Sequence, residues 1–269
     1  MDVINSKILL NLDYPDIINA CQALPAFARV CDDPYFWALK AEYDFGIPQD
    51  ELQLVPGSSN LERYKFIYDI KDPNTGLVEA ASLGTLALVR YFLKLGADLH
   101  AMDEEALYLA ADNGHLDVVK YLVELGADNE YALKLVARDG HLDIVKYLVE
   151  QGADIHARDE DALRSAAMNG HLDVVKYLVE LGANIHARNE EALVVAAGNG
   201  HLDVVEYLVE LGANLHIIGE YPLRLAAGNG HLDVVKYLVE LGANSQVILN
   251  DANKYKTEIV DYIRNLYQG

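Results

Sequence analysis

The fold is decided by the stretch GHLDVVKYLVELGAN, residues 170–184, which recurs along the chain with few changes. Close copies of it begin at Gly114, Gly140, Gly170, Gly200 and Gly230. The first spacing is 26 residues and the others are 30. A fixed period in this range is typical of a stacked array of supersecondary units. Such an array offers an extended surface, and this favours binding over catalysis as the class of function.

Charge narrows the range of partners. The chain has 269 residues, 52% of them hydrophobic, and carries 42 acidic against 21 basic side chains, so its formal net charge is −21. A field of that sign repels phosphate backbones, and we therefore expect no nucleic-acid partner. A partner protein with a basic surface is compatible with the negative charge of the chain.

The N-terminal segment and the cysteines bear on localisation. Asp13 and Asp16 interrupt the first apolar stretch, so it does not resemble a signal peptide. No run approaches the roughly 18 apolar residues of a membrane span. Cys21 and Cys31 form no C-x-x-C motif, and we expect them to be reduced and buried in an intracellular protein. The prediction is a cytoplasmic monomer without a membrane segment.

Each unit of the array predicts two helices and a loop. A short first helix presents Ala166-Ala167 on its apolar side and ends at Asn169-Gly170, where glycine supplies a left-handed residue. A second helix follows His171, with apolar side chains at helical spacing until Gly182. Neither helix can bury its apolar face alone, so neighbouring units must stack.

This unit, ALRSAAMNGHLDVVKYLVELGAN at residues 162–184, resembles the ankyrin repeat, whose usual signature is T-P-L-H-x-A-A followed by N-G-H. The Thr-Pro pair is mostly replaced, only Pro222 remaining, and the period is 30 instead of 33. The resemblance implies an all-α ankyrin-repeat solenoid with minimal β-hairpin fingers over residues 75–250. The sequences of the units are also similar to those of the ankyrin families of giant DNA viruses that infect amoebae. This resemblance would place the protein in the cytoplasm of an infected host cell.

The array has irregular members. A degenerate unit at residues 251–269 carries Lys254, Lys256 and Arg264, and we expect it to be a polar C-terminal cap. Between Gly126 and His141 the chain is four residues shorter than in the regular units, which predicts a notch in the binding edge. Second helices of six recognisable units begin near Leu86, Leu116, Leu142, Leu172, Leu202 and Leu232.

The histidines could suggest metal chemistry, because each His-Leu-Asp copy carries two potential ligands. Residues i and i+2 of a helix point about 200° apart, however, and successive copies lie roughly 8–10 Å apart, too far to share an ion. Five histidines open the second helices and four lie in the loops, which accounts for all nine in the chain. We predict no catalytic residue, no metal site, no cofactor and no enzymatic activity.

Two other patterns have structural explanations. Gly198-Asn199-Gly200 resembles a phosphate-binding G-x-G, but it follows a helix and lacks the third glycine, so we interpret it as a turn. The paired carboxylates Glu104-Glu105 and Glu190-Glu191 could act as an acid pair. We expect them instead at solvated loop tips.

Partner-binding residues should lie where the repeats differ, because packing determines the framework positions. The variable positions follow the Ala-Ala pair, follow the core leucine, or stand at the loop tips. In ankyrin arrays these columns line the concave groove, and Met and Arg are enriched at interface cores. We predict contacts with a target protein at Met102, Tyr108, Asp112, Lys134, Arg138, Arg158, Arg164, Met168, Arg188, Ile218 and Arg224.

The N-terminal residues 1–55 predict a separate helical domain, followed by a connecting helix and turn at residues 56–74. Residues 8–40, ILLNLDYPDIINACQALPAFARVCDDPYFWALK, resemble the F-box, with its L-x-x-L-D-x-x-D-I opening and F-x-x-V-C-x-D-x-x-F-W end. The Leu-Pro that usually begins the motif is absent. F-boxes dock on the linker subunit of cullin-type ubiquitin ligases, and the resemblance implies docking through Leu9, Leu12, Ile17, Ile18 and Trp37.

Two functional hypotheses follow. In the first, the array captures a target protein and the F-box-like helices present it to a ubiquitin ligase. In the second, the protein is a plain ankyrin interaction scaffold whose N-terminal helices only cap the first repeat. Packing of Ile17, Ile18 and Trp37 on the first repeat would favour the second hypothesis.

Overall fold

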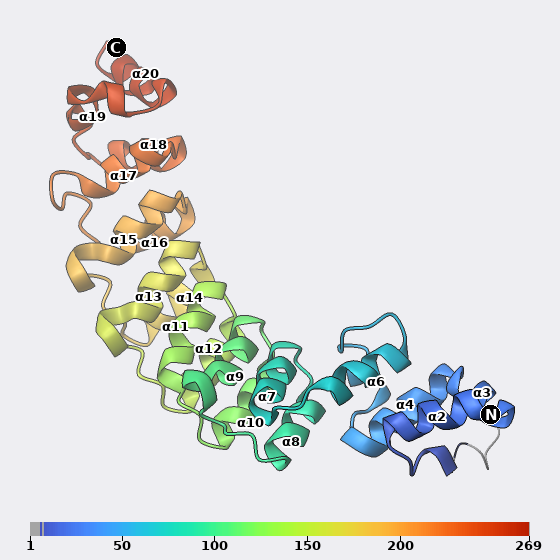
Figure 1. Cartoon of the computed structure of the whole chain (residues 1–269). Coiled ribbons are helices and arrows are strands. Elements are labelled where there is room, and N and C mark those ends of the chain that lie inside the picture. Colours follow the sequence, from blue (N-terminus) through green and yellow to red (C-terminus); the bar gives the residue numbers. More distant parts are fainter. Residues whose placement is uncertain (1–5, 7, 269) are drawn as a thin grey trace. The chain divides into compact units, whose positions relative to one another are not determined.

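The computed structural model describes residue 6 and residues 8–268, and over these residues the protein is helical without strands (Figure 1). It divides into two compact units, which we call unit 1 (Met1–Asp128) and unit 2 (Asn129–Gly269). The predicted all-α repeat architecture is confirmed. The division falls within the repeats, where the shortened unit begins. The domain boundaries drawn above, after residues 55, 74 and 250, stay predictions.

Unit 1 begins with helices that start at prolines. Proline lies in the first turn of α2 (Tyr14–Ala23), α3 (Pro25–Cys31) and α4 (Pro34–Phe45), where a helix does not use its N–H group. Asp13 and Asp33 cap α2 and α4 by accepting backbone N–H groups at 3.0 and 2.9 Å. The unit continues with α5 (Gln49–Leu52), α6 (Asn60–Asp69), α7 (Pro73–Ser82), α8 (Leu86–Lys94), α9 (Ala101–Asp112) and α10 (Leu116–Glu124).

An aromatic cluster holds the helices of unit 1 together. The Trp37 ring of α4 lies 5.9 Å from Tyr14 of α2 and 5.2 Å from Tyr64 of α6, measured between ring centroids. Phe45, at the end of α4, makes a T-shaped contact with Tyr91 of α8 at 5.3 Å. Rings in such geometries contribute about 0.5–1.5 kcal/mol beyond their buried area. The aromatic side chains therefore join the N-terminal helices to the first repeat.

The cysteines differ from expectation. Cys21 and Cys31 form a disulfide, with their Cα atoms 6.3 Å apart, and both residues are half-buried. The prediction of two reduced, buried thiols is therefore wrong for this structure. The physical reason is the tight connection at Leu24, which folds α3 back beside α2 and brings the two residues together.

Unit 2 is a stack of two helical layers (Figure 1). The first helices of its repeats pack directly on one another because their contact face carries small residues such as Ala166 and Ala167, both fully buried. They are α11 (Asn129–Asp139), α13 (Ala157–Asn169), α15 (Ala187–Asn199) and α17 (Tyr221–Asn229). The second helices are α12 (Leu142–Glu150), α14 (Leu172–Glu180), α16 (Leu202–Glu210) and α18 (Leu232–Glu240), and the unit ends with α19 (Gln246–Asn250), the short 3-10 helix Ala252–Lys254 and α20 (Thr257–Leu266).

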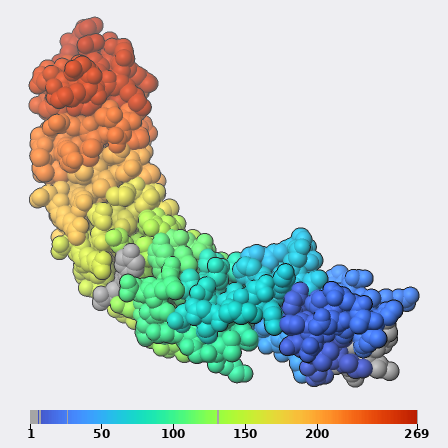
Figure 2. All heavy atoms as spheres, in the orientation of Figure 1, coloured from blue at the N-terminus to red at the C-terminus, as the bar shows by residue number. Residues whose placement is uncertain are grey.

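The second helices supply most of the apolar burial. In α14 the side chains of Val174, Val175 and Leu178 are fully buried, and the equivalent residues of α12, α16 and α18 are buried as well. Each such side chain contributes roughly 1.5–3 kcal/mol when it leaves water. In the face shown by Figure 2, the atoms of successive repeats in unit 2 touch along the stack. None of the described helices is long and apolar enough to cross a membrane.

The histidine that precedes the second helices α10, α14, α16 and α18 joins neighbouring repeats. The His201 ring covers Gly170 of the preceding repeat, and its Nε2 lies 2.9 Å from the carbonyl oxygen of Met168. In unit 1, His115 covers Gly84 in the same way. The glycine has a positive φ, 78° at Gly170, and a Cβ there would overlap the imidazole. Both conformation and space therefore require glycine at this position.

The C-terminal unit replaces this histidine by a lysine. The side chain of Lys256 lies over Gly230, and its Nζ donates to the carbonyl of Asn229 at 3.3 Å. Beyond it, Ile259, Val260 and Ile263 of α20 are buried against the stack. This arrangement buries the last apolar face while a cation, which water can solvate, takes the histidine's position.

We predict that Gly170→Ala destabilises the protein more than Gly182→Ala. Both glycines have positive φ, but only Gly170 lies under a histidine, whereas a Cβ at Gly182 meets open space. Gly182→Ala should lower the free energy of unfolding by about 1–2 kcal/mol, the cost of the left-handed conformation. Gly170→Ala should lose about 1–3 kcal/mol more, because it overpacks against His201. Equal losses in chemical denaturation of the two variants would contradict the stacking role of His201.

Candidate interaction surface

Among the described residues, four loops turn through consecutive residues in the left-handed conformation. Residues 158–160 have φ values of 53°, 56° and 67°, and residues 102–104, 188–190 and 218–220 adopt the same turn. Residues other than glycine rarely adopt this conformation. These loops lie where minimal hairpin fingers were predicted, and each finger is a single left-handed turn without a strand. We call the first residue of each turn the loop tip: Met102, Arg158, Arg188 and Ile218.

A His–Glu pair holds each turn. Glu160, the third residue of its turn, is only 5% exposed, and its Oε1 lies 2.7 Å from Nδ1 of His156. The pairs His186–Glu190 and His216–Glu220 repeat this contact at 2.8 and 3.0 Å, and His100 bonds Glu104 in unit 1. The prediction of a solvated carboxylate is therefore wrong for Glu190, because the left-handed turn rotates its side chain inward beneath the histidine.

The shortened repeat, which begins at Asn129, lacks the left-handed turn and its His–Glu pair. Its first helix, α11, begins at Asn129, and none of its described residues other than glycine has a positive φ. The chain therefore passes from one repeat to the next without a loop tip. Whether this serves as a functional notch stays a prediction.

Asp161 organises basic side chains from two neighbouring repeats. Its carboxylate is buried and lies 3.0 Å from Nζ of Lys134 and 2.5 Å from Nη2 of Arg164. Burial alone would raise the pKa of Asp161, but hydrogen bonds from Arg164 and Lys134 outweigh it and lower the pKa below its ordinary value. The carboxylate is therefore charged, and it orients both cations at the surface.

Arg188 extends this group across the loop tips. Its Nη2 donates to the carbonyl oxygen of Arg158 at 2.6 Å, one repeat away. The carboxylates of Asp159 and Glu191 lie 3.7 and 3.6 Å from its guanidinium nitrogens, beyond ordinary hydrogen-bond distance. The structure therefore brings together four of the predicted residues, Lys134, Arg158, Arg164 and Arg188, around Asp161.

The other predicted contact residues lie outside this group, on first helices and loop tips of unit 2 and of unit 1. Arg138 pairs with Asp139 at 2.9 Å, and Met168 is half-buried. Ile218 is 69% exposed at its loop tip, and Arg224 is exposed on α17. In unit 1, Met102 is 58% exposed, whereas Tyr108 and Asp112 are half-buried.

The carboxylates that position the arginines were missed in the sequence. Asp161 was not among the predicted residues, although its spacing of three residues from Arg164 on a helix is the ordinary spacing of an ion pair. The contact with Lys134 crosses between repeats, and no local pattern reports it. No group of three or more His, Cys, Asp or Glu side chains in the described part of the chain is arranged to hold a metal ion.

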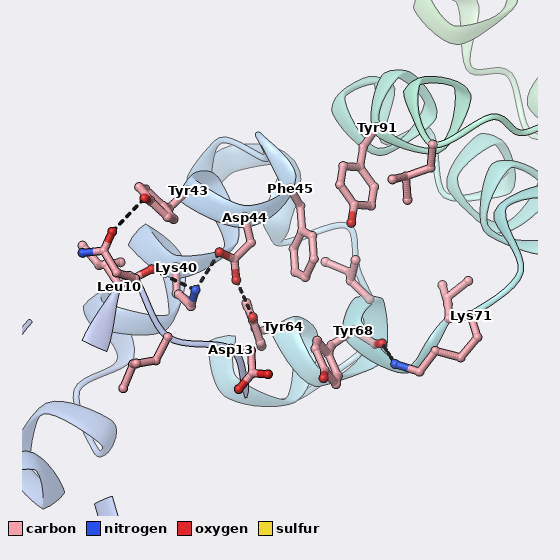
Figure 3. Close-up of a pocket in the computed structure, with 15 residues that line it drawn as sticks. Leu10, Asp13, Lys40, Tyr43, Asp44, Phe45, Tyr64, Tyr68, Lys71 and Tyr91 are labelled. Atoms are coloured by element: carbon pink, nitrogen blue, oxygen red, sulfur yellow. Dashed lines mark hydrogen bonds and ion pairs between the residues drawn. The ribbon is translucent and has the colours of Figure 1, made fainter. Parts of the chain in front are cut away.

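Unit 1 contains a separate open cavity of about 520 Å³ (Figure 3). Its aromatic wall comes from Phe45, Tyr64, Tyr68 and Tyr91 on α4, α6 and α8. Figure 3 shows the hydroxyl of Tyr91 directed toward this space, with Lys71 at the opposite edge. Cavities of this size and character are typical of binding sites.

A buried ion pair forms the polar wall of this cavity. Lys40 is 2% exposed, and its Nζ lies 2.6 Å from Oδ1 of Asp44 and donates to the carbonyl of Leu10 at 3.0 Å. The hydroxyl of Tyr64 donates to the other carboxylate oxygen, Oδ2, at 2.5 Å (Figure 3). Burial, and then the hydrogen bond to Asp44, raise the pKa of Tyr64. The two charges are paired at hydrogen-bond distance, so neither is left buried without a partner.

The residues predicted to dock a ligase are divided between core and surface. Leu9, Ile17 and Trp37 are at most 1% exposed, and the indole nitrogen of Trp37 donates to the carbonyl of Cys31 at 2.7 Å. These three side chains belong to the core of unit 1 and present no surface to a partner in this structure. Leu12 and Ile18 are half-exposed, and Leu12 lines the cavity. The aromatic partners of Trp37 lie on α2, α4 and α6, not on the first repeat.

We predict that the pKa of His156 lies above its ordinary value of about 6.5, because the hydrogen bond to Glu160 favours the charged imidazole. The pair's contribution to loop stability should be complete below pH about 6.5 and lost as pH rises through the raised pKa. An NMR titration of Glu160→Gln should show a lower midpoint for His156. The midpoint of His100, raised by its own Glu104, should not move. An unchanged His156 midpoint would contradict the assignment.

Comparison with known proteins agrees with the repeat geometry. The family model for ankyrin repeats (3 copies) matches residues 53–131, 128–189 and 186–251, which together make up well over half of the chain. No curated protein matches the chain at a significant level. Ankyrin-repeat proteins are generally non-enzymatic scaffolds that bind other proteins. With its paired helices, glycine turns and interlocking histidines, the chain belongs to the ankyrin-repeat family.

Proposed function

We propose that this protein is an interaction scaffold that binds a target protein through the first helices and loop tips of unit 2. The observation that carries the proposal is the group around Asp161. Side chains that differ between otherwise repeated units come together there on one surface. Arginine in such a position combines several hydrogen-bond donors with a planar face, which suits it to protein interfaces.

The contrast between the two helices of each repeat supports this assignment. The second helices α10, α14 and α18 have the identical sequence LDVVKYLVE, as packing between repeats requires. The first helices and loop tips differ at their exposed positions, although the same packing constrains their buried positions. Variation that the fold does not require is therefore concentrated on one side of the stack.

We predict that Arg188→Ala weakens target binding about tenfold, whereas Lys176→Glu does not. Lys176 is exposed on a second helix, and the chain itself carries glutamate at the equivalent position, Glu206. The measurement is capture of proteins from a lysate by the full chain, quantified by mass spectrometry for wild type and both variants. Targets should be retained by wild type and Lys176→Glu and depleted with Arg188→Ala. Loss of the same targets in both variants, or no difference from wild type in either, would reject the surface.

A second candidate function concerns the N-terminal helices. The resemblance of residues 8–40 to the F-box supports docking to the linker subunit of a cullin-type ubiquitin ligase. Leu12, which lines the open cavity, and Ile18, which lies outside it, are half-exposed and therefore accessible to a partner. In this role the protein is an adaptor that presents the target held by unit 2. The alternative remains a plain scaffold.

We predict that Leu12→Ser and Ile18→Ser each reduce co-purification with the ligase linker subunit if unit 1 is an adaptor. Substitutions of Ile17 or Trp37 would not test this, because loss of those buried side chains would disrupt the core. The fluorescence of Trp37, the single tryptophan of the chain and a core residue of unit 1, serves as the control for intact folding. Absence of co-purification with the wild-type chain would leave the plain scaffold as the function.

A further inference from the structure

We infer that the second helices of unit 2 bind an arginine or lysine side chain of a partner protein, over the ring of Tyr237 and beside Glu206 and Glu210. This site is distinct from the surface proposed above, which consists of first helices and loop tips. The inference follows from a contact that recurs along the second helices and is interrupted at one place.

A basic side chain covers a tyrosine ring of the next second helix at several places in the chain. Nζ of Lys146 on α12 lies 5.6 Å from the centre of the Tyr177 ring on α14. A cation within about 6 Å of a ring centre is attracted by the negative face of the ring. The equivalent contacts are Lys176 over Tyr207 at 5.5 Å, Lys236 over Tyr262 at 5.5 Å and, in unit 1, Arg90 over Tyr121 at 5.0 Å.

This contact is missing at Tyr237. The helix before it, α16, carries Glu206 at the position where α12, α14 and α18 carry lysine. No cation of the described residues lies over the Tyr237 ring. The helix α16 packs on α18, and burial, followed by the charges of Glu206 and Glu210, raises the pKa of Tyr237. Two carboxylates therefore lie near the one ring of this series that holds no cation.

The exchange of lysine for glutamate is unfavourable for the fold. Glu206 and Glu210 are four residues apart on α16, and like charges at this spacing destabilise a helix. Neither carboxylate has a hydrogen bond or ion pair within the described part of the chain. Lysine at the same position of the neighbouring helices shows that packing does not require glutamate. A residue that the fold does not favour points to a contact made outside the chain.

The surrounding helices carry the charge that attracts a basic partner. The helix α16 has three carboxylates, Asp203, Glu206 and Glu210, and no basic residue. The adjacent helices α14 and α18 each have two carboxylates and one lysine. The three helices, which follow one another along the stack (Figure 1), therefore carry seven carboxylates against two lysines. Both lysines already cover tyrosine rings, so a partner's cation meets an excess of negative charge at Tyr237.

Exposed leucines lie beside the carboxylates and the ring. Leu211 follows Glu210 directly, and Leu241 follows Tyr237 by four residues, a spacing that places both on one side of a helix. Their side chains are 46% and 45% exposed. Leu181 occupies the same position one repeat earlier, so the leucines offer apolar contacts along the whole face and Glu206 selects one place on it. The expected partner segment has an arginine or lysine next to an apolar residue.

The test is an NMR titration of the full chain, labelled on its tyrosine rings, with short synthetic peptides. The probe is Ser-Gly-Leu-Arg-Leu-Gly-Ser, and its control replaces arginine by citrulline, which has a similar shape without the charge. The signal of Tyr237 is assigned as the one that disappears in Tyr237→Phe. The arginine peptide should shift the Tyr237 signal, and the citrulline peptide should bind about tenfold more weakly.

Glu206→Lys separates binding from folding. It places a lysine where α14 and α18 have one, so the melting temperature should rise by about 1–3 °C, while affinity for the arginine peptide should fall about tenfold. Glu150→Lys changes the net charge equally but lies two helices before α16, roughly 16–20 Å away, beyond the screening length of about 8 Å. This control should leave the affinity unchanged, and a variant that is more stable and yet binds less cannot be explained by a structural role.

Lys176→Glu should create a second site. It removes the cation from the Tyr207 ring and leaves Glu180 in place, which reproduces the arrangement found at Tyr237. The arginine peptide should then shift the signals of both Tyr207 and Tyr237. In the wild-type chain, where Lys176 covers its ring, Tyr207 should not respond.

Several outcomes would overturn the inference. These are an unshifted Tyr237 signal, equal binding of the citrulline peptide, unchanged affinity in Glu206→Lys, and no response of Tyr207 in Lys176→Glu. Equal shifts of Tyr177, Tyr207 and Tyr237 in the wild-type chain would also reject it, because they would indicate attraction to the negative charge of the whole face and not a site at Tyr237.

Discussion

The contact between a histidine ring and the glycine of the preceding repeat is the constraint on which the stack depends. His201 covers Gly170 and approaches the carbonyl oxygen of Met168 at 2.9 Å, so one side chain satisfies a helix terminus and sets the distance between repeats. The alanine faces of the first helices can pack closely only at that distance. Because each contact joins neighbouring repeats, stability is added along the stack instead of being concentrated in one core.

The loops depend on a different contact from the helices, because a His–Glu pair holds each turn of left-handed residues. A turn of left-handed residues is costly, yet it positions Glu160 beneath His156, and the same pair recurs at Glu190 and Glu220. The second oxygen of each of these carboxylates is buried without a hydrogen-bond partner among the described residues. The loops therefore hold a defined conformation through one charged contact each, and they keep the tips in fixed positions along unit 2.

The sequence predicts the helices well because helical periodicity and the glycine stops are local signals. It also shows correctly that the histidine columns follow the repeat. The left-handed turns could not be predicted, since Ala-Arg-Asp-Glu-Asp at residues 157–161 is equally compatible with a loop or a helix start, and the His156–Glu160 contact decides between them. The disulfide was missed because the pairing depends on how α3 folds beside α2. Arg164 and Arg188 were found by their variability, whereas Asp161, which joins them, depends on contacts between repeats.

The repeats are held together by one set of residues and the loop tips are formed by another. This separation explains how a repeat protein can carry a binding surface at little cost to its fold. A strained residue such as Ile218 affects the free energy of one loop, and the neighbouring His–Gly contacts remain intact because they lie on the opposite ends of the helices. Stacking energy from residues such as Val204 and Leu208 far exceeds that local penalty, at roughly 1.5–3 kcal/mol for each buried side chain. The loop tips can therefore differ from repeat to repeat while the second helices stay nearly identical, and recognition can change without a change in the stack.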